Sequence, residues 1–528
     1  MAAIETDTGS KIAGKDKIST ETQDVEKAGS TLSCSRATTE DVPRAKMIRD
    51  KVAVLRHLGN LEAWLDQRIG VETQGIDRIP EDKKNAPSLL NAFLMWFSFN
   101  GHVATLPVGL LGPEFGLSLQ LSVVAIVVGT LLGSFFPAYC ATLGPKLGLR
   151  AIATSRYSFG FWGAKVCAVI NIVVNVGFAV VSLVLAGQLL SAVSDYKMTI
   201  DVGCVIVSLV SYLISFAGFG MIHTFEKYMW ILAFILECVL VGQAAPHIAT
   251  DTPSSWSGLE LSAAFLTFMA ISFAYAAAWA STTSDYYCNY LSTTPRWKIF
   301  TLTYAGLSIS TIFTLTIGAC VGNAVFTYAP WTDAYDAHGL GGAMGEMYHP
   351  NAWSKFALVM STFTVLGTLV ASNYSAGLAA QLVGDYFHAV PRLIWSFLAM
   401  VVALVLAVAG HDYLSTILSN FCSMLGYWSV CFAVILFLED QWFRRKDGYD
   451  LHAWDDPKAL PMGIAAVGTL VIGYCVGGVL GMDQTWFVGP IAKAFGGIGG
   501  DVGIYLCFVI SIIVYWPLRT LEKSMVKR

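Results

Sequence analysis

Polar side chains interrupt several long apolar stretches of this 528-residue sequence. One stretch reads WFSFNGHVATLPVG, so Ser98, Asn100 and His102 fall near its middle. Another reads AYAAAWASTTSDYY, in which Trp279 is followed by four hydroxyl side chains. A polar group in a bilayer is costly unless it is bonded or has a function. The chemistry that these residues and a break in the helix offer is hydrogen bonding to ions or to the polar atoms of a substrate.

Two further apolar stretches carry polar residues at helical spacing. Asn175, Phe178 and Ser182 are three and four residues apart, which places them on one helical face. Thr368 and Asn373 interrupt a later stretch. Small hydroxyl residues such as Ser182 also occur where helices simply pack closely, so each of them has a structural alternative.

Two titratable groups lie within apolar stretches. Glu237, in FILECVLV, is the only carboxylate well inside one, and it should be protonated or hydrogen-bonded there. His102 is of a type that titrates near neutral pH. Each could carry a coupling proton, and each could instead be a hydrogen-bonded structural residue.

The sequence offers little for other functional classes. The apolar stretches contain no HExxH, no DxxxD and no Ser–His pair, which argues against a membrane enzyme. The polar residues gather at one depth and do not follow a continuous path, which argues against a channel. We expect no cofactor and no metal site, and the net charge of −4 predicts no nucleic-acid partner. The 11 cysteines include no CxxC pair, so they indicate packing residues and no disulfide scaffold.

The elements that position these residues are membrane-spanning helices. The chain is 55% hydrophobic and 13% charged, whereas soluble domains have about 25% charged residues. Because a span needs about 20 apolar residues, we predict an all-α polytopic membrane protein with about twelve transmembrane helices. They are placed at residues 90–111, 118–143, 164–193, 200–218, 227–245, 262–284, 299–325, 355–382, 391–409, 412–438, 460–481 and 500–518.

The basic residues support this count. If alternate loops are cytoplasmic, all of the 33 Lys and Arg residues except Lys197, Lys355 and Lys493 fall on the cytoplasmic side. This is the positive-inside pattern, and it predicts that both termini are cytoplasmic.

The chain is thereby divided into five regions. They are a largely disordered cytoplasmic tail (1–87) with a surface helix in VLRHLGNLEAWLDQRIG, a transport core of helices 1–10 (88–440), a cytoplasmic loop (441–459), helices 11 and 12 (460–519), and a cytoplasmic C-terminus (520–528). The glycines Gly477 to Gly481 in helix 11 offer a possible homodimer face.

Helices 1 and 6 are the two most strongly interrupted, and they are five spans apart. Discontinuous helices in corresponding positions of two halves are the mark of inverted repeats in secondary transporters. We therefore predict a five-plus-five inverted repeat with two extra C-terminal helices, and a binding site where the broken helices expose backbone groups.

The sequence resembles the fungal purine-cytosine permeases of the nucleobase:cation symporter family 1 over roughly residues 78–520. The segments that carry the resemblance are WFSFNG, LGLRAIATSRYSFGFWGAKVCAVINIVVNVGF, GFGMIHTFEKYMW, AAAWASTTSDY and SNYSAGLAAQ. The resemblance implies a plasma-membrane importer, with proton rather than sodium coupling in the fungal members. It also implies a substrate site between a bundle (helices 1, 2, 6 and 7) and a scaffold (helices 3, 4, 8 and 9).

The resemblance assigns roles to individual residues. Ser98, with Asn100, matches the helix 1 motif, and Phe178 matches the helix 3 aromatic that stacks a heterocycle. Ser182 falls on the helix 3 amide position, and Trp279 on the helix 6 aromatic. In helix 8, Asn373 aligns with a substrate-bonding position, and Thr368 with a coupling-ion ligand.

Helix 8 departs from the family pattern. Cytosine and purine carriers usually show an NNIPN-type motif, whereas this chain reads TLVASN, so Thr368, Leu369 and Ala371 replace two asparagines and a proline. Fewer amides leave fewer groups to read a nucleobase edge. A cytosine- or purine-type nucleobase is the leading prediction, with a vitamin B6-like or other small heterocycle as the alternative, and a non-transporting ligand sensor as a second.

The resulting hypothesis is a flat ring held between Phe178 and Trp279. Asn373, Ser182 and Asn175 would bond its edge, and Ser98 and Asn100 would line the unwound part of helix 1. A proton would bind near Thr368, Glu237 or His102 and bias the movement of bundle against scaffold.

Overall fold

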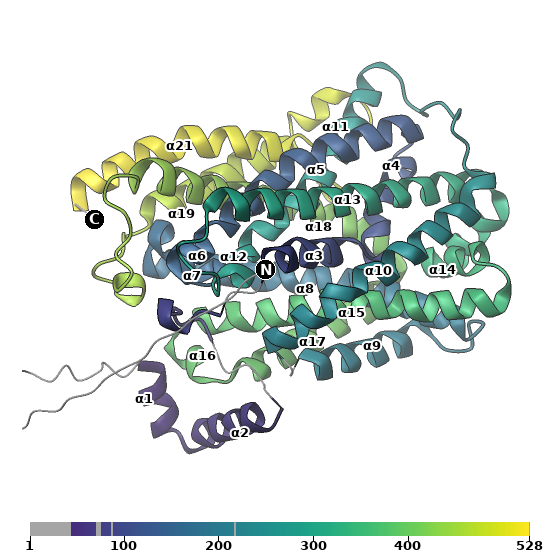
Figure 1. Ribbon diagram of the computed structural model, residues 1–528. Helices are drawn as coiled ribbons and strands as arrows, with labels where there is room; N and C mark the ends of the chain where they lie inside the picture. The colour runs from purple at the N-terminus through teal and green to yellow at the C-terminus, as the bar shows by residue number, and fades with distance from the viewer. Residues whose placement is uncertain (1–43, 70–74, 86–87, 216–217, 527–528) are drawn as a thin grey trace, which may run out of the picture. The chain divides into compact units, whose positions relative to one another are not determined.

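The computed structural model describes residues 44–69, 75–85, 88–215 and 218–526, and these are almost entirely helical (Figure 1). Within that part of the chain, nine helical stretches are long and apolar enough to cross a membrane. One of them, Arg392–Phe443, contains two of the predicted spans, and Leu89–Asn100 and Ile200–Ser215 are shorter apolar helices. Every predicted span coincides with a helix or with helices joined at a break.

The helices that correspond to the predicted spans are α3 (Leu89–Asn100) with α4 (Leu106–Glu114), α5 (Leu119–Ala141), α8 (Arg156–Val193), α9 (Ile200–Ser215), α10 (Gly218–Ala244), α11 (Gly258–Ala277) with α12 (Thr283–Tyr287), α13 (Arg296–Thr327), α15 (Asn351–Leu382), α17 (Arg392–Gly410), α18 (Leu414–Leu438), α19 (Ile464–Ile472) with α20 (Val479–Gly481), and α21 (Gly503–Val526). Short helices connect them, including α6 (Leu143–Leu147), α7 (Ala151–Thr154) and α16 (Asp385–Ala389). Strands β1 (Asp483–Gln484) and β2 (Phe487–Val488) form a small antiparallel hairpin.

The first span is broken, as predicted. Helix α3 ends at Gly101 (φ −88°, ψ 63°), and His102 is extended (φ −149°, ψ 159°). A short 3-10 turn, η2 (Val103–Thr105), leads into α4. Pro107 stands at the start of α4, where a residue without an N–H loses no helical hydrogen bond.

The sixth span is broken in the same way. Helix α11 passes into a 3-10 turn, η4 (Ala278–Ser281), and Thr282 (φ −129°, ψ −20°) separates that turn from α12. The two breaks are five spans apart, which is the spacing the inverted repeat predicts.

The core helices form two groups. Helices α3, α4, α5, α11 and α13 pack mainly on one another, and α8, α9, α15 and α17 do the same. In Figure 1 the first group occupies the upper part of the molecule and the second the lower part. The close approach of α4 to α13 depends on Gly109, where an added Cβ would lie 2.1 Å from the carbonyl oxygen of Leu315. These groups match the bundle and the scaffold that the family resemblance implies.

The region 326–353, predicted as an external loop, contains a helix, α14 (Ala329–Met347). It is a helix of low hydropathy, kinked at Gly339 (φ 68°), so its sequence lacks the apolar signal of a span.

The part of the tail that the structure describes contains two helices and a buried segment. Helices α1 (Arg44–Lys51) and α2 (Ala53–Ile69) form, the latter over the predicted surface helix. Ile76 and Ile79 are buried, so the segment 75–85 packs on the protein. Residues 1–43 lie outside the described residues.

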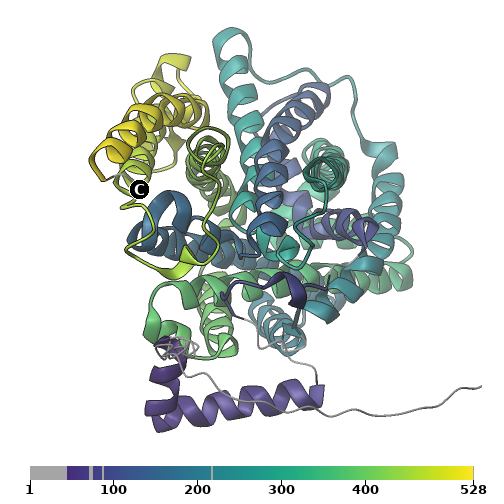
Figure 2. The same ribbon diagram turned by 60° about the vertical axis from the view of Figure 1, so that its left-hand side comes forward.

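The prediction of a dimer face at Gly477 to Gly481 is wrong. The C-terminal helices, yellow in Figures 1 and 2, pack together along one side of the core. A Cβ at Gly477 would lie 2.8 Å from the backbone nitrogen of Cys507, and one at Gly481 would lie 2.8 Å from that of Gly503. These glycines therefore seat α21 of the same chain, and they are not available to a second copy.

Candidate functional site

The two broken helices are joined at their breaks. The indole nitrogen of Trp279 donates a hydrogen bond to Oδ1 of Asn100 across 2.9 Å. The Nδ2 group of Asn100 donates to the carbonyl oxygen of Trp96 at 3.2 Å. Both ends of the Asn100 carboxamide are thus occupied, which makes it a link between the halves of the bundle.

Aromatic rings surround this link. The ring of Trp279 stacks on Phe99, with centroids 5.5 Å apart and planes at 10°, and it meets Trp96 edge-on at 5.3 Å. Trp279 is the partly exposed ring of this group, and Trp96 and Phe99 are buried. The sequence pointed to Trp279 but not to Phe99, which lies between Ser98 and Asn100 and reads as a packing residue.

Phe178 belongs to a different aromatic group. It meets Tyr275 edge-on at 5.8 Å and Phe421 at 5.4 Å. Among the described residues, no direct contact joins its ring to that of Trp279. The two rings that were predicted to stack on a substrate from opposite sides thus belong to separate aromatic clusters. Tyr275, which sequence reasoning missed, lies four residues before Trp279, so helical spacing could have indicated it.

The asparagine side chains of the predicted site differ in the hydrogen bonds that they already form within the protein. Asn175 donates to the carbonyl oxygen of Asn171 at 2.7 Å, and the Asn171 side chain accepts from Ser281 at 2.7 Å. This ties α8 to the break in the sixth span through Asn171, a second residue that the sequence analysis missed.

Asn373 is different because its carboxamide forms no hydrogen bond with any residue that the structure describes, although the side chain is 3% exposed. Its backbone carbonyl accepts a hydrogen bond from the hydroxyl of Ser396 at 2.9 Å. Ser98 and Ser182 are also buried. A buried amide without a partner is a group that a bound ligand can satisfy.

His102 lies between the two groups of helices. Its Nδ1 accepts from the backbone N–H of Ala104 at 3.2 Å, and its Nε2 lies 2.9 Å from the carbonyl oxygen of Phe99. The same Nε2 contacts the hydroxyl of Thr368 on α15. This geometry fits the neutral ring with its proton on Nε2. The imidazole fills the space between a free carbonyl of the broken helix and a hydroxyl of the scaffold.

Glu237 lies apart from that pair. Its Oε2 accepts from the hydroxyl of Thr314 on α13 at 3.1 Å, and its Oε1 has no partner among the described residues. The structure thus brings together two of the three predicted coupling residues, His102 and Thr368.

Asp285 and Arg150 join the sixth span to the segment that follows the second. Asp285 accepts from the backbone N–H of Ala151 at 2.7 Å, and Arg150 donates to the carbonyl oxygen of Asp285 at 2.8 Å. Only about 10 Å³ of free space remains there, beside Ser375, which contacts the carboxylate of Asp285 at 3.4 Å. A cavity of about 260 Å³ lies at the opposite end. The core is therefore more tightly packed at the end that holds Asp285 than at the end that holds the larger cavity.

Comparisons with known proteins match this chain to a permease family and to individual transporters. Residues 78–489 match the family described as "permease for cytosine/purines, uracil, thiamine, allantoin". The chain is 31% identical to the vitamin B6 transporter of Saccharomyces cerevisiae, covering 89% of this chain and 91% of that protein. It is 30% identical to the purine-cytosine permease FCY2 of the same yeast, covering 86% of each.

The fold also matches a solved transporter. Mhp1, a nucleobase-cation-symport-1 family transporter solved in a closed conformation with bromovinylhydantoin bound, superposes with a TM-score of 0.66. The match covers 86% of this chain and 96% of that chain at 13% sequence identity. At this identity the likeness concerns the fold.

Proposed function

This chain belongs to the family of permeases for cytosine and purines, uracil, thiamine and allantoin, and we propose that it imports a small flat heterocycle together with a proton by alternating access. It is a multi-pass secondary transporter of nucleobase type. A cytosine- or purine-type ring is the proposed substrate, carried inward across the plasma membrane with both chain termini in the cytoplasm.

One observation supports this proposal most strongly. The residue Asn373 is buried, its carboxamide forms no hydrogen bond with the described residues, and it lies on α15, the helix whose Thr368 contacts His102 in the break of the first span. In this proposal Ser98, Asn175 and Ser182 supply further polar groups to the ring, and Asn100 positions Trp279 through their hydrogen bond. A planar ring that enters between Trp279 and Phe178 would gain stacking worth roughly 1–3 kcal/mol.

A vitamin B6-type ring is the alternative substrate. A curated relative with that function is as similar to this chain as the purine-cytosine permeases are. Helix α15 carries TLVASN at the site, so it offers a single amide, Asn373, to a ring edge. A hydroxylated pyridine asks for fewer amide contacts than a nucleobase does, so this observation favours it.

The proposed coupling ion is a proton, with His102 as its carrier and Thr368 as its neighbour. The oxygens that would bind sodium, on Phe99 and Thr368, are already engaged by the imidazole. A proton added to Nδ1 would remove the acceptor for the Ala104 N–H within the break of the first span and place a positive charge beside Thr368 of α15. Glu237 is then a hydrogen-bonded packing residue. Homodimer formation remains a prediction, without the glycine face.

Uptake in a strain lacking its own carriers tests the proposal. Radiolabelled cytosine, adenine, hypoxanthine, uracil, allantoin, thiamine and pyridoxine are compared, each competed against the others. We expect saturable uptake of one class, inhibited by a protonophore. Ligand binding by purified protein without any flux in reconstituted vesicles would identify a sensor instead.

A further inference from the structure

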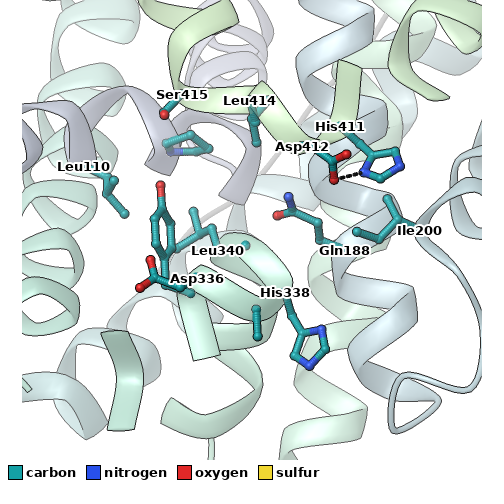
Figure 3. Close-up of a pocket in the computed structure, with 14 residues that line it drawn as sticks. Leu110, Gln188, Ile200, Asp336, His338, Leu340, His411, Asp412, Leu414 and Ser415 are labelled. Atoms are coloured by element: carbon teal, nitrogen blue, oxygen red, sulfur yellow. Dashed lines mark ion pairs between the residues drawn. The ribbon is translucent and has the colours of Figure 1, made fainter. Parts of the chain in front are cut away.

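The cavity of about 260 Å³ on the outer side (Figure 3) shares no lining residue with the proposed central site. Gln188, which lines it, is ten residues beyond Phe178 on α8, a distance of about 15 Å along a helix. Ser415 on α18 is six residues from Phe421, again toward the outer end. The cavity therefore lies beyond the rings of Phe178 and Phe421, on the side from which an imported solute arrives.

The charges around this cavity are mostly negative. Asp336 and Asp412 line it, and among the lining residues there is no Lys or Arg. Asp336 forms no ion pair with any residue that the structure describes. His411 lies between two carboxylates, 3.3 Å from Asp201 and 3.0 Å from Asp412. Carboxylates at the mouth of a low-dielectric cleft concentrate cations there.

A buried amide points into the same cavity. Gln188 is 4% exposed, and its Oε1 accepts from the backbone N–H of Gly341 at 3.3 Å. Its Nε2 group has no hydrogen bond to the described residues. Figure 3 shows the carboxamide of Gln188 directed toward the centre of the lining residues. A buried donor of this kind is satisfied by a ligand oxygen or ring nitrogen.

Apolar side chains complete the cavity. Pro107 and Leu110 come from the outer half of the first span, Leu340 comes from α14, and Ile200 comes from α9. This volume lies just below the range of about 300–1,000 Å³ typical of drug-sized ligands, so it suits a single small ring. The apolar surfaces can cover the ring faces while Asp336 and Gln188 meet its substituents.

We propose that this outer cavity is a second binding site, which takes a heteroaromatic ring bearing a positive charge or an amino group before that ring reaches the central site. This proposal rests on the proposed function only for the order in which a solute would occupy the outer cavity and the central site. The binding itself follows from Asp336, Asp412 and Gln188, and it can be measured without transport.

Equilibrium binding to the purified full-length chain in a neutral detergent tests it. The probes are pyridoxamine and 4-pyridoxate, which share a ring and carry opposite charges. Trp279→Ala, made to weaken the central site, should still bind one pyridoxamine and no 4-pyridoxate. Raising NaCl from about 0.05 M to about 0.5 M should weaken this binding about tenfold, because the attraction is screened.

Asp336→Asn in the Trp279→Ala background should weaken pyridoxamine binding to a similar extent. Asp336 is exposed, so this substitution leaves the fold intact. Asp333→Asn, also exposed on α14 and outside the cavity, is the matched control. Loss of all binding in Trp279→Ala, or equal binding of 4-pyridoxate, would overturn the second site.

Failure here and failure of the proposed function give different results. Transport with no outer binding would refute only the second site. Salt-sensitive outer binding without uptake of any heterocycle would support the second site and refute the importer.

Discussion

Trp279 and Asn100 are hydrogen-bonded to each other at the points where their two helices are broken. The bond runs from an indole N–H of the sixth span to a carboxamide oxygen of the first. The same carboxamide is held by the backbone of Trp96. This pair is therefore a direct contact through which the two broken helices can affect each other.

Trp279→Phe tests the link. Phenylalanine retains a ring to stack on Phe99 but has no N–H, so the bond to Asn100 is lost. A hydrogen bond of this kind contributes about 0.5–1.5 kcal/mol, so we expect the maximal uptake rate per surface transporter to fall about two- to tenfold. Trp297→Phe, at an exposed tryptophan, should leave the rate unchanged. Equal rates in both variants would show that the bond has no role in transport.

Thr368→Val and His102→Asn test the coupling proposal. Valine has nearly the shape of threonine without the hydroxyl that contacts His102. If His102 carries the coupling proton, wild-type uptake should rise as the external pH falls, and both variants should lose that rise. Thr364→Val is the matched control, because the Thr364 hydroxyl bonds only within its own helix, to Ser361 at 2.7 Å. An unaltered pH profile in His102→Asn would remove His102 from the mechanism.

Glu237→Gln separates coupling from packing. Glutamine can keep the bond to Thr314 and carries no proton to transfer, so we expect uptake and its pH dependence to be retained. Glu237→Ala should reduce the thermal stability of the purified protein, because it leaves a cavity and an unpaired Thr314. A pH-independent Glu237→Gln transporter would instead make Glu237 the coupling acid.

Several features were predictable because they depend on local composition. The spans follow from the length of apolar runs, and the breaks in the first and sixth follow from Gly101, Pro107 and the polar residues after Trp279. The α14 helix was missed because its sequence, APWTDAYDAHGLGGAMGEM, contains no long apolar run.

The details of the site were harder to predict because they depend on contacts between distant segments. The sequence indicates that Asn100 is a substrate ligand, whereas in the structure its carboxamide is already bonded to Trp279 and Trp96. The sequence indicates that Phe99 is a packing residue, whereas in the structure its ring stacks on that of Trp279. Gly477 reads as an interface residue until α21 is found against it.

The described part of the N-terminal tail gives a pH prediction outside the membrane. Partial burial alone would raise the pKa of Glu81, but its bonds from Lys84 and from the backbone N–H of Ser292 (2.6 Å) hold that pKa below its usual value. A carboxyl group whose pKa is lowered by folding stabilises the folded protein at pH values above its usual pKa of 4.5. This stabilisation is lost as the pH falls through the lower pKa of the folded state.

Hydrogen exchange at the Ser292 amide should therefore be protected at neutral pH and lose protection below about pH 4.5, after correction for the intrinsic rate. Glu81→Gln should show no such step. Protection that instead increases as the pH falls would contradict the contact between the tail and the loop before α13.

The central claim is that a flat ring binds where the two broken helices meet, against Trp279 and the amide of Asn373. Its most direct test is the apparent KM of uptake for Trp279→Ala and Asn373→Ala at surface expression equal to that of the wild type. The account predicts that KM rises about fivefold or more in each variant, since each loses a contact worth at least about 1 kcal/mol. A KM unchanged in both variants would place the substrate elsewhere.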